Sequence, residues 1–283
     1  MNGTVSLVAR GRRLVAVAVV AVAMAVVTGC EPPAPPPGPP TGECKPDPFT
    51  VQFQRDIDAY GAGAHNVTAA VYDDRTGCWY HLRRGQRVTT ASVVKLEIMA
   101  AALLRAQDQG RGLTEWEQSR IKPMMHSSDD PAASALWVNL GGGRAMSDYG
   151  TRLGLHATIE TEPKWGLTST TAEDQAAFVH RLLQTDLVQP GPRGYAWWQM
   201  RNVRGDQRWG ISRGVPGDWE YGLKNGFFDS TCCGWRVNSV GYVADPEGGG
   251  YSIAVLSDGW RSLDQGIPMV EAVAAQVSGT LTK

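Results

Sequence analysis

Ser92 and Lys95 frame the segment Ser92-Val93-Val94-Lys95, which follows a strand-like run and begins an apolar helical pattern. Residues at i and i+3 share one face of a helix, so the serine hydroxyl and the lysine amine can meet. A serine hydroxyl is a weak nucleophile until a base takes its proton, and a lysine can do this where burial or nearby positive charge lowers its pKa. The pair predicts acyl transfer, although the bare spacing also fits a solvated lysine near a helix start.

Two triplets follow further along the chain. Ser128-Asp129-Asp130 stands where serine β-lactamases and penicillin-binding proteins carry Ser-Asp-Asn, and Lys224-Asn225-Gly226 stands where they carry Lys-Thr-Gly. With these motifs the chain resembles the class A β-lactamase and penicillin-binding-protein superfamily of serine acyl enzymes. It is similar in particular to the β-lactamase-like serine hydrolases that actinobacteria export as lipoproteins. The resemblance covers roughly Asn66 to the C-terminus.

The resemblance implies a catalytic role for several residues. Ser92 would be the nucleophile, Lys95 its base, and Ser128 the hydroxyl that passes a proton to the leaving nitrogen. Lys224 would make protonation of Lys95 less favourable and would attract a substrate carboxylate. The backbone N–H groups of Ser92 and Phe227 would form the oxyanion hole.

The same resemblance assigns substrate binding to Asp130, Asn225 and Gly226. Asp130 departs from the usual asparagine. An asparagine can donate an N–H to the acylamide carbonyl of a substrate, whereas an ionised aspartate only accepts. Ordinary β-lactam recognition is therefore in question at this position. Asp129 is expected to cap the following turn with its side chain.

The sequence does not decide which residue would activate water for deacylation. Glu162-Pro163 resembles the glutamate, and its neighbour, that activate the hydrolytic water in class A β-lactamases. Only the segment 164–169 separates this pair from the next expected helix, so the loop is shorter than that of the family. Glu162 is either a candidate deacylation base or a solvated loop acid. Slow deacylation would make the protein a poor β-lactamase that traps its substrate.

The N-terminus has the pattern of an export signal. Arginines at positions 10, 12 and 13 precede an apolar run over 14–27, which is too short for a comfortable membrane span. Residues 1–29 are expected to be a lipoprotein signal peptide, because Val27-Thr28-Gly29-Cys30 resembles a lipobox in which Cys30 is diacylated. An ordinary secretory cleavage is the alternative, and Arg12-Arg13 leaves open whether export uses the general or the twin-arginine route. We expect the protein at the extracytoplasmic face of the cell membrane.

Residues 30–48 are rich in proline and carry no periodic apolar pattern, so we expect an extended tether to Pro48 and folded structure from Phe49. Four cysteines follow the lipidated one, and in an exported protein an even count favours disulfides. Adjacent Cys232 and Cys233 can close only a strained ring, so each is expected to bridge to Cys44 or Cys78. A metal site is the competing interpretation, but no Cys-x-x-Cys spacing supports it.

Composition limits the partners. A net charge of −1 lacks the basic excess that phosphate binding needs, so no nucleic-acid partner is expected. The five histidines are scattered without metal-ligand spacing, and no cofactor or metal is predicted. We expect a monomer that acts on a small-molecule or peptidoglycan-derived substrate and reaches the membrane through its N-terminal lipid.

Periodicity outlines one α+β domain over residues 49–283. A helix over 49–60 and a hairpin of 67–72 with 78–82 precede a helical insert at about 93–190. Residues 190–219 are expected to be loop with short helices, followed by three strands and a closing helix over 262–281. This order predicts an antiparallel five-stranded sheet flanked by helices, with an inserted all-helical subdomain, and the three motifs would line the cleft between the two parts.

Three functions fit these expectations. The first is a tethered serine hydrolase that forms an acyl enzyme with a β-lactam, amide or ester. The second is a D,D-carboxypeptidase or amidase acting on peptidoglycan stems. The third is a lipoprotein that keeps the cleft but only binds a ligand, which the intact set of Ser92, Lys95, Ser128 and Lys224 disfavours.

Overall fold

A five-stranded antiparallel sheet forms the centre of the molecule, with the order β2-β1-β7-β6-β5. A computed structural model describes residues 42–60, 66–230 and 233–283. Strand β1 pairs with β7 along its whole length, so segments from opposite ends of the domain share one sheet. The strands are β1 (Asn66–Asp73), β2 (Cys78–Leu82), β5 (Glu220–Ser230), β6 (Gly234–Ala244) and β7 (Gly250–Asp258).

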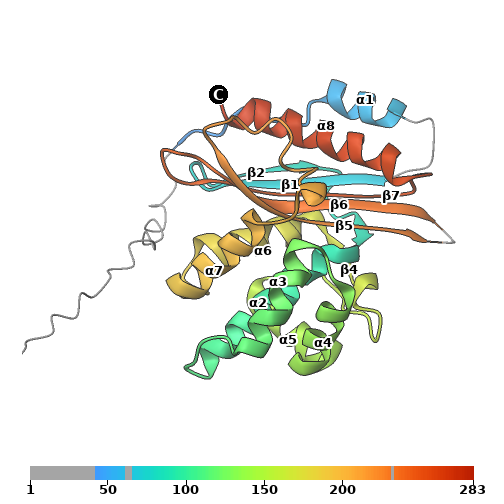
Figure 1. The fold of residues 1–283 in the computed structure, drawn as a ribbon. Coiled ribbons are helices and arrows are strands. Elements are labelled where there is room, and N and C mark those ends of the chain that lie inside the picture. The colour runs from blue at the N-terminus through green and yellow to red at the C-terminus, as the bar shows by residue number, and fades with distance from the viewer. Residues whose placement is uncertain (1–41, 61–65, 231–232) are drawn as a thin grey trace, which may run out of the picture. The chain divides into compact units, whose positions relative to one another are not determined.

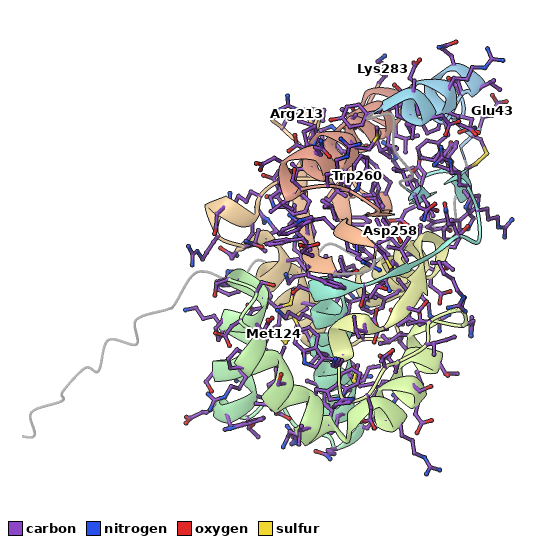
Figure 2. All side chains as sticks on the ribbon, turned by 90° about the vertical axis from the view of Figure 1, so that its right-hand side faces the viewer. Glu43, Met124, Arg213, Asp258, Trp260 and Lys283 are labelled. Atoms are coloured by element: carbon purple, nitrogen blue, oxygen red, sulfur yellow. A yellow bond between two sulfur atoms is a disulfide. The ribbon has the colours of Figure 1, made fainter. Side chains whose placement is uncertain are left out.

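Two helices, α1 (Val51–Ala59) and α8 (Leu263–Leu281), cover one face of this sheet (Figure 1). Each begins at a side-chain cap that satisfies a free backbone N–H: Thr50 accepts from the N–H of Phe53, and Ser262 from that of Gln265. The apolar side chains of α8 pack against inward-facing residues of the sheet, and Trp260 lies in this layer (Figure 2).

The helical insert covers the opposite face (Figure 1). Its core centres on α2, whose side chains are buried nearly all round, as expected for a helix surrounded by other elements. Met124, on α3, belongs to this second core (Figure 2). The helices are α2 (Val94–Asp108), α3 (Glu115–His126), α4 (Asp130–Leu140), α5 (Gly142–Leu153), α6 (Ala172–Gln184) and α7 (Pro190–Arg201). This architecture confirms the predicted fold class.

A small second sheet joins the start of the insert to a point between its helices α5 and α6. Strand β3 (Arg87–Thr89) leads into the insert and pairs with β4 (Ser169–Thr171), which lies between the loop after α5 and helix α6. Among the described residues there are also three short 3-10 turns: η2 (Ala91–Val93), η3 (Trp165–Leu167) and η4 (Gly205–Gln207). The start of α2 and the loop of residues 154–168 are thereby held side by side.

The structure corrects the expectation for residues 190–219. The first twelve of them form α7, although the segment is rich in Gly and Pro. Pro190 lies in the first turn, where a helix needs no backbone N–H from it. Ala196 and Met200, one turn apart, are buried in the second core. Tertiary packing therefore outweighs the low helix propensity of the segment.

The N-terminal boundary also differs from the expectation. Cys44 forms a disulfide with Cys78, so neither is available to Cys232 or Cys233, and the predicted cross-pairing is wrong. Cys233 is itself disulfide-bonded. The carbonyl of Lys45 accepts a hydrogen bond from Tyr80, so the last residues of the predicted tether belong to the folded domain.

The predicted signal peptide and residues 30–41 of the tether, with Cys30, lie outside the described residues. Within the part of the chain that the structure describes, no helix combines the length and the apolar character that a bilayer span requires.

Candidate active site

Ser92 lies in the turn η2, at the N-terminal end of α2, where the peptide N–H groups are free of helical partners. Two backbone contacts fix this turn: the N–H of Thr90 donates to Thr168 O at 2.8 Å, and the N–H of Val93 donates to Thr90 O at 3.2 Å. Asn238 on β6 adds a side-chain anchor by donating to the carbonyls of Thr89 and Thr90 at 2.9 and 3.1 Å. The sheet thus holds the nucleophile turn directly.

Strand β5 passes very close to this turn at Gly226. A Cβ atom built on Gly226 would lie 2.8 Å from Ser92 N and 2.6 Å from Val93 N. Both are backbone atoms, which cannot rotate away. The third motif therefore needs glycine here because two stretches of main chain come into contact.

Lys95 is fully buried and is surrounded by oxygens. Its Nζ lies 2.9 Å from Ser92 Oγ, 3.0 Å from Ser128 Oγ, 2.6 Å from Ser128 O and 2.5 Å from Asp130 Oδ1. The ring of Trp165 covers the amine, with its centroid 5.0 Å from Nζ. The predicted contact between the first two motifs is present.

Ser128 connects the two lysines. It lies between α3 and α4 with φ of +60°, a left-handed conformation that is uncommon for a residue with a side chain. Its hydroxyl accepts from Lys224 Nζ at 3.0 Å, and Lys224 is 1% exposed. Asp129 caps α4 by accepting from the N–H of Ala132, as predicted. The site therefore contains a continuous chain of Ser92 hydroxyl, Lys95 amine, Ser128 hydroxyl and Lys224 amine.

Burial makes both amines easier to deprotonate. Removal from water lowers the pKa of Lys95, while the hydrogen bond and charge of Asp130 oppose this shift. The pKa of Lys224 lies well below its ordinary value because of burial and because of the positive charge of Lys95. An unprotonated amine beside Ser92 is thus attainable at lower pH than for a solvated lysine.

A cleft opens at Ser92, one end of this chain of groups, whereas Lys95, Ser128 and Lys224 do not line it, contrary to the expectation that all three motifs would line it. Its cavity measures about 280 Å³ and is walled mainly by apolar and aromatic side chains. Ser92 and Asp130 supply polar groups to it, as expected of a ligand site. The lining consists of Ala91, Ser92, Asp130, Lys164, Trp165, Gly166, Leu167, Phe227 and Phe228.

Comparison with known proteins agrees with this geometry. The family model described as the β-lactamase enzyme family matches residues 118–281, more than half of the chain. The chain belongs to the β-lactamase enzyme family. The match contains Ser128 and Lys224, whereas Ser92 and Lys95 precede it.

Other members and structures resemble this β-lactamase-family chain. "Putative lipoprotein LppW" of Mycobacterium tuberculosis, and its Mycobacterium bovis counterpart, are 28% identical to it over 202 residues, which is 66% of this chain. The chain spans 62% of the length of these relatives. A β-lactamase from Xanthomonas campestris superposes with a TM-score of 0.71 at 20% identity, covering 81% of this chain and 96% of that one.

A second similar structure is that of PBP-A captured as an acyl-enzyme complex with penicillin G. It has a TM-score of 0.69 and 18% identity, and the superposition covers 81% of this chain and 94% of that one. At these identities the two structural likenesses show the fold.

Two residues predicted for the β-lactamase-family site, Asn225 and Glu162, make hydrogen bonds outside the cleft. The side chain of Asn225 is 1% exposed and donates to the carbonyls of Gln207 and Trp209 at 2.8 and 3.0 Å, so it holds a loop and does not line the cleft. Glu162 is exposed, and its carboxylate accepts a hydrogen bond from the N–H of Gly143 at the start of α5. Of its two interpretations, the geometry fits the loop acid.

Several residues of the site were not identified from the sequence. Trp165, Leu167 and Phe228 wall the cleft, and Asn238 anchors the nucleophile turn. Their residue types are common in cores and loops, so only their position in space marks them. Phe228 alone had an indirect signal, because it follows the predicted oxyanion residue Phe227 on the same strand.

Proposed function

We propose that this chain is a serine acyl-transfer hydrolase in which Ser92 forms an acyl enzyme with a β-lactam, an amide or an ester. The observation that carries this proposal is the unbroken chain of groups from Ser92 Oγ through Lys95 and Ser128 to Lys224, with separations of 2.9 to 3.0 Å. These distances allow proton transfer at every step.

In the proposed reaction Lys95 takes the proton of Ser92, and Oγ attacks the substrate carbonyl carbon. The developing oxyanion would lie between the N–H groups of Ser92 and Phe227. Ser128 would then give its proton to the leaving nitrogen as the C–N bond breaks, and would recover one from Lys95. Water would finally cleave the ester and return the proton to the enzyme.

The deacylation step has no carboxylate assigned to it, because Glu162 is bonded to Gly143 and does not line the cleft. We therefore expect a long-lived acyl enzyme, as in a penicillin-binding protein, in preference to rapid β-lactam turnover.

Intact-protein mass spectrometry tests the proposal. The full chain is incubated with a fluorophosphonate and with a penicillin, and the Ser92→Ala variant is treated in parallel. We expect a mass increase that depends on Ser92 and that decays slowly for the penicillin adduct. A wild-type protein that remains unmodified by both reagents would exclude the hydrolase. Release of terminal D-alanine from a peptidoglycan stem peptide would identify a D,D-carboxypeptidase, and an unchanged cellular function after Ser92→Ala would identify a binding protein.

The proposal includes a membrane anchor at Cys30. The lipobox-like sequence supports it, as does the similarity to a protein named as a lipoprotein. We expect radiolabelled palmitate to be incorporated into the wild-type chain and not into Cys30→Ser. The same substitution should move the protein from the membrane fraction to the soluble fraction, and continued membrane association would contradict the anchor.

A further inference from the structure

Only one oxygen of the Asp130 carboxylate contacts Lys95. Oδ1 lies 2.5 Å from Lys95 Nζ, yet the side chain as a whole is 71% exposed and lines the cleft. Among the described residues, the hydrogen bonds of this carboxylate involve Oδ1 alone. The other oxygen is therefore open to whatever enters the cleft.

The contacts of Lys95 show what the inner oxygen does. Asp130 Oδ1 and Ser128 O can only accept hydrogen bonds. A neutral amine has two N–H groups, which these two acceptors occupy, so its lone pair is left for the hydroxyl of Ser92 at 2.9 Å. The oxygen of an asparagine amide would accept the same hydrogen bond, although without the charge that raises the pKa of Lys95. The inner hydrogen bond alone therefore does not explain why an aspartate is present.

Asparagine and aspartate differ at position 130 in the side-chain atom that faces the cleft. An asparagine that points its oxygen at Lys95 offers an N–H donor to the cleft, whereas Asp130 offers a second acceptor. A carbonyl oxygen facing this carboxylate would lose its hydrogen bond to water and gain repulsion, while an N–H donor would gain a charge-assisted hydrogen bond.

We propose that Asp130 selects acyl donors that present an amine N–H next to the scissile carbonyl, and discriminates against donors that present an acylamide carbonyl there. This inference rests on the proposed function, since it concerns the substrate class of the same Ser92 site. Asp130 is thus the specificity-determining residue on the acyl side of the cleft.

Two β-lactams with the same bicyclic core test the selection. 6-Aminopenicillanic acid carries a free amine beside the lactam carbonyl, and benzylpenicillin carries an acylamide in its place. Acylation of Ser92 in the full chain is followed by intact-protein mass spectrometry with each compound, in the wild type and in Asp130→Asn. We expect the wild type to react at least about tenfold faster with the amine. Asp130→Asn should reverse this preference.

The readout is the ratio of the acylation rates with the two compounds. A general loss of reactivity in the variant lowers both rates equally and leaves this ratio unchanged. A ratio that is equal in wild type and variant, or a wild type that prefers benzylpenicillin, would overturn the inference. Labelling of Ser92 by a fluorophosphonate separates this failure from failure of the proposed function, because that reagent lacks both groups. Should Asp130→Asn fail to fold, as judged by thermal unfolding, Asp130→Ala provides the second variant. It removes the outer acceptor and adds no polar atom, so it should abolish the preference.

Discussion

Gly226 shows how much of the site depends on main-chain contact between separate segments. Its partner across the sheet is Asn238, whose side chain holds the carbonyls before Ser92. One residue pair on β5 and β6 therefore contacts the nucleophile turn from two directions. This contact sets the identity of both residues: the first has no room for a side chain, and the second needs a side-chain donor.

We expect Gly226→Ala to displace β5 from the turn, because the added Cβ would lie 2.6 Å from Thr90 O and Val93 N. A shift of this kind should slow fluorophosphonate labelling of Ser92 by at least about tenfold. Gly217→Ala is the matched control, since nothing lies near its Cβ position, and should label at the wild-type rate. Equal labelling rates in both variants, with both folded by thermal unfolding, would contradict the contact.

The charge of Asp130 gives a second prediction. Burial lowers the pKa of Lys95 and Asp130 raises it again, with Asp129 acting in the same direction. Labelling of Ser92 by a fluorophosphonate should rise with pH as Lys95 loses its proton, with a midpoint below the ordinary lysine value of 10.5. Asp130→Asn removes the opposing charge, so the midpoint should move to lower pH. The background measured with Ser92→Ala is subtracted, and an unchanged or higher midpoint would refute the role of the carboxylate.

Among the elements, α2 and the loop of residues 154–168 meet at a pair of carboxyl groups. Glu97 is fully buried two residues after Lys95, and the negative charge of Glu160 acts on it. Gln175 on α6 donates to Glu97, and Thr168 donates to Glu160. Burial and a neighbouring negative charge both disfavour the ionised form of a carboxyl group. Accordingly, burial and the neighbouring carboxyl raise the pKa of Glu97 well above its ordinary value.

This pair predicts a stability that falls with rising pH. The folded state keeps its proton above the ordinary glutamate pKa of 4.5, whereas the unfolded chain releases it, so the free energy of unfolding decreases through the window between the two pKa values. Glu97→Gln removes the titrating carboxyl group and should flatten this decline. We expect a gain of about 1–3 kcal/mol at neutral pH, measured by urea unfolding at several pH values. Glu247→Gln, at an exposed site, should leave the slope unchanged, and a parallel decline in both variants would argue against a raised pKa at Glu97.

Elements with strong local signals were predictable from the sequence. The caps Thr171 and Ser262 and the turn before Cys78 mark their elements because the deciding contacts lie within a few residues. Helix α7 was missed because its stability comes from burial of Ala196 and Met200 against other elements. The spacing of Ser92 and Lys95 predicted their contact for the same local reason.

Pairings between distant segments had no such signal. The Glu97–Glu160 pair, the anchoring of the turn by Asn238 and the Cys44–Cys78 bond each join residues far apart in the chain. Glu162 shows the limit of a local resemblance, which left two roles open for it. Its neighbours in sequence resemble those of a catalytic glutamate, but the short loop places its carboxylate on the N–H of Gly143.

At the scale of the whole molecule, the cleft lies where four segments meet: the turn η2, the start of α4, the turn η3 and strand β5. The sheet separates two apolar cores, one shared with the insert and one with α1 and α8 (Figure 1). Each of these segments packs against one of the two cores. Packing on both faces of the sheet therefore holds the reactive groups in place.

The Cys44–Cys78 disulfide ties the beginning of the domain to the edge strand β2, across a sequence separation of 34 residues. It closes a loop that contains α1 and β1, and the chain-entropy model assigns such a loop about 3–4 kcal/mol of stabilisation. We expect the double variant Cys44→Ser/Cys78→Ser to lose stability of this order in urea unfolding at fixed pH. A double variant is preferable to a reducing agent, which would also act on the bond of Cys233. Fluorophosphonate labelling of Ser92 should persist in the folded variant, because the disulfide lies outside the cleft lining. Wild-type stability in the double variant would mean that α1 and the packing of Phe49 hold the N-terminal segment without the covalent bond.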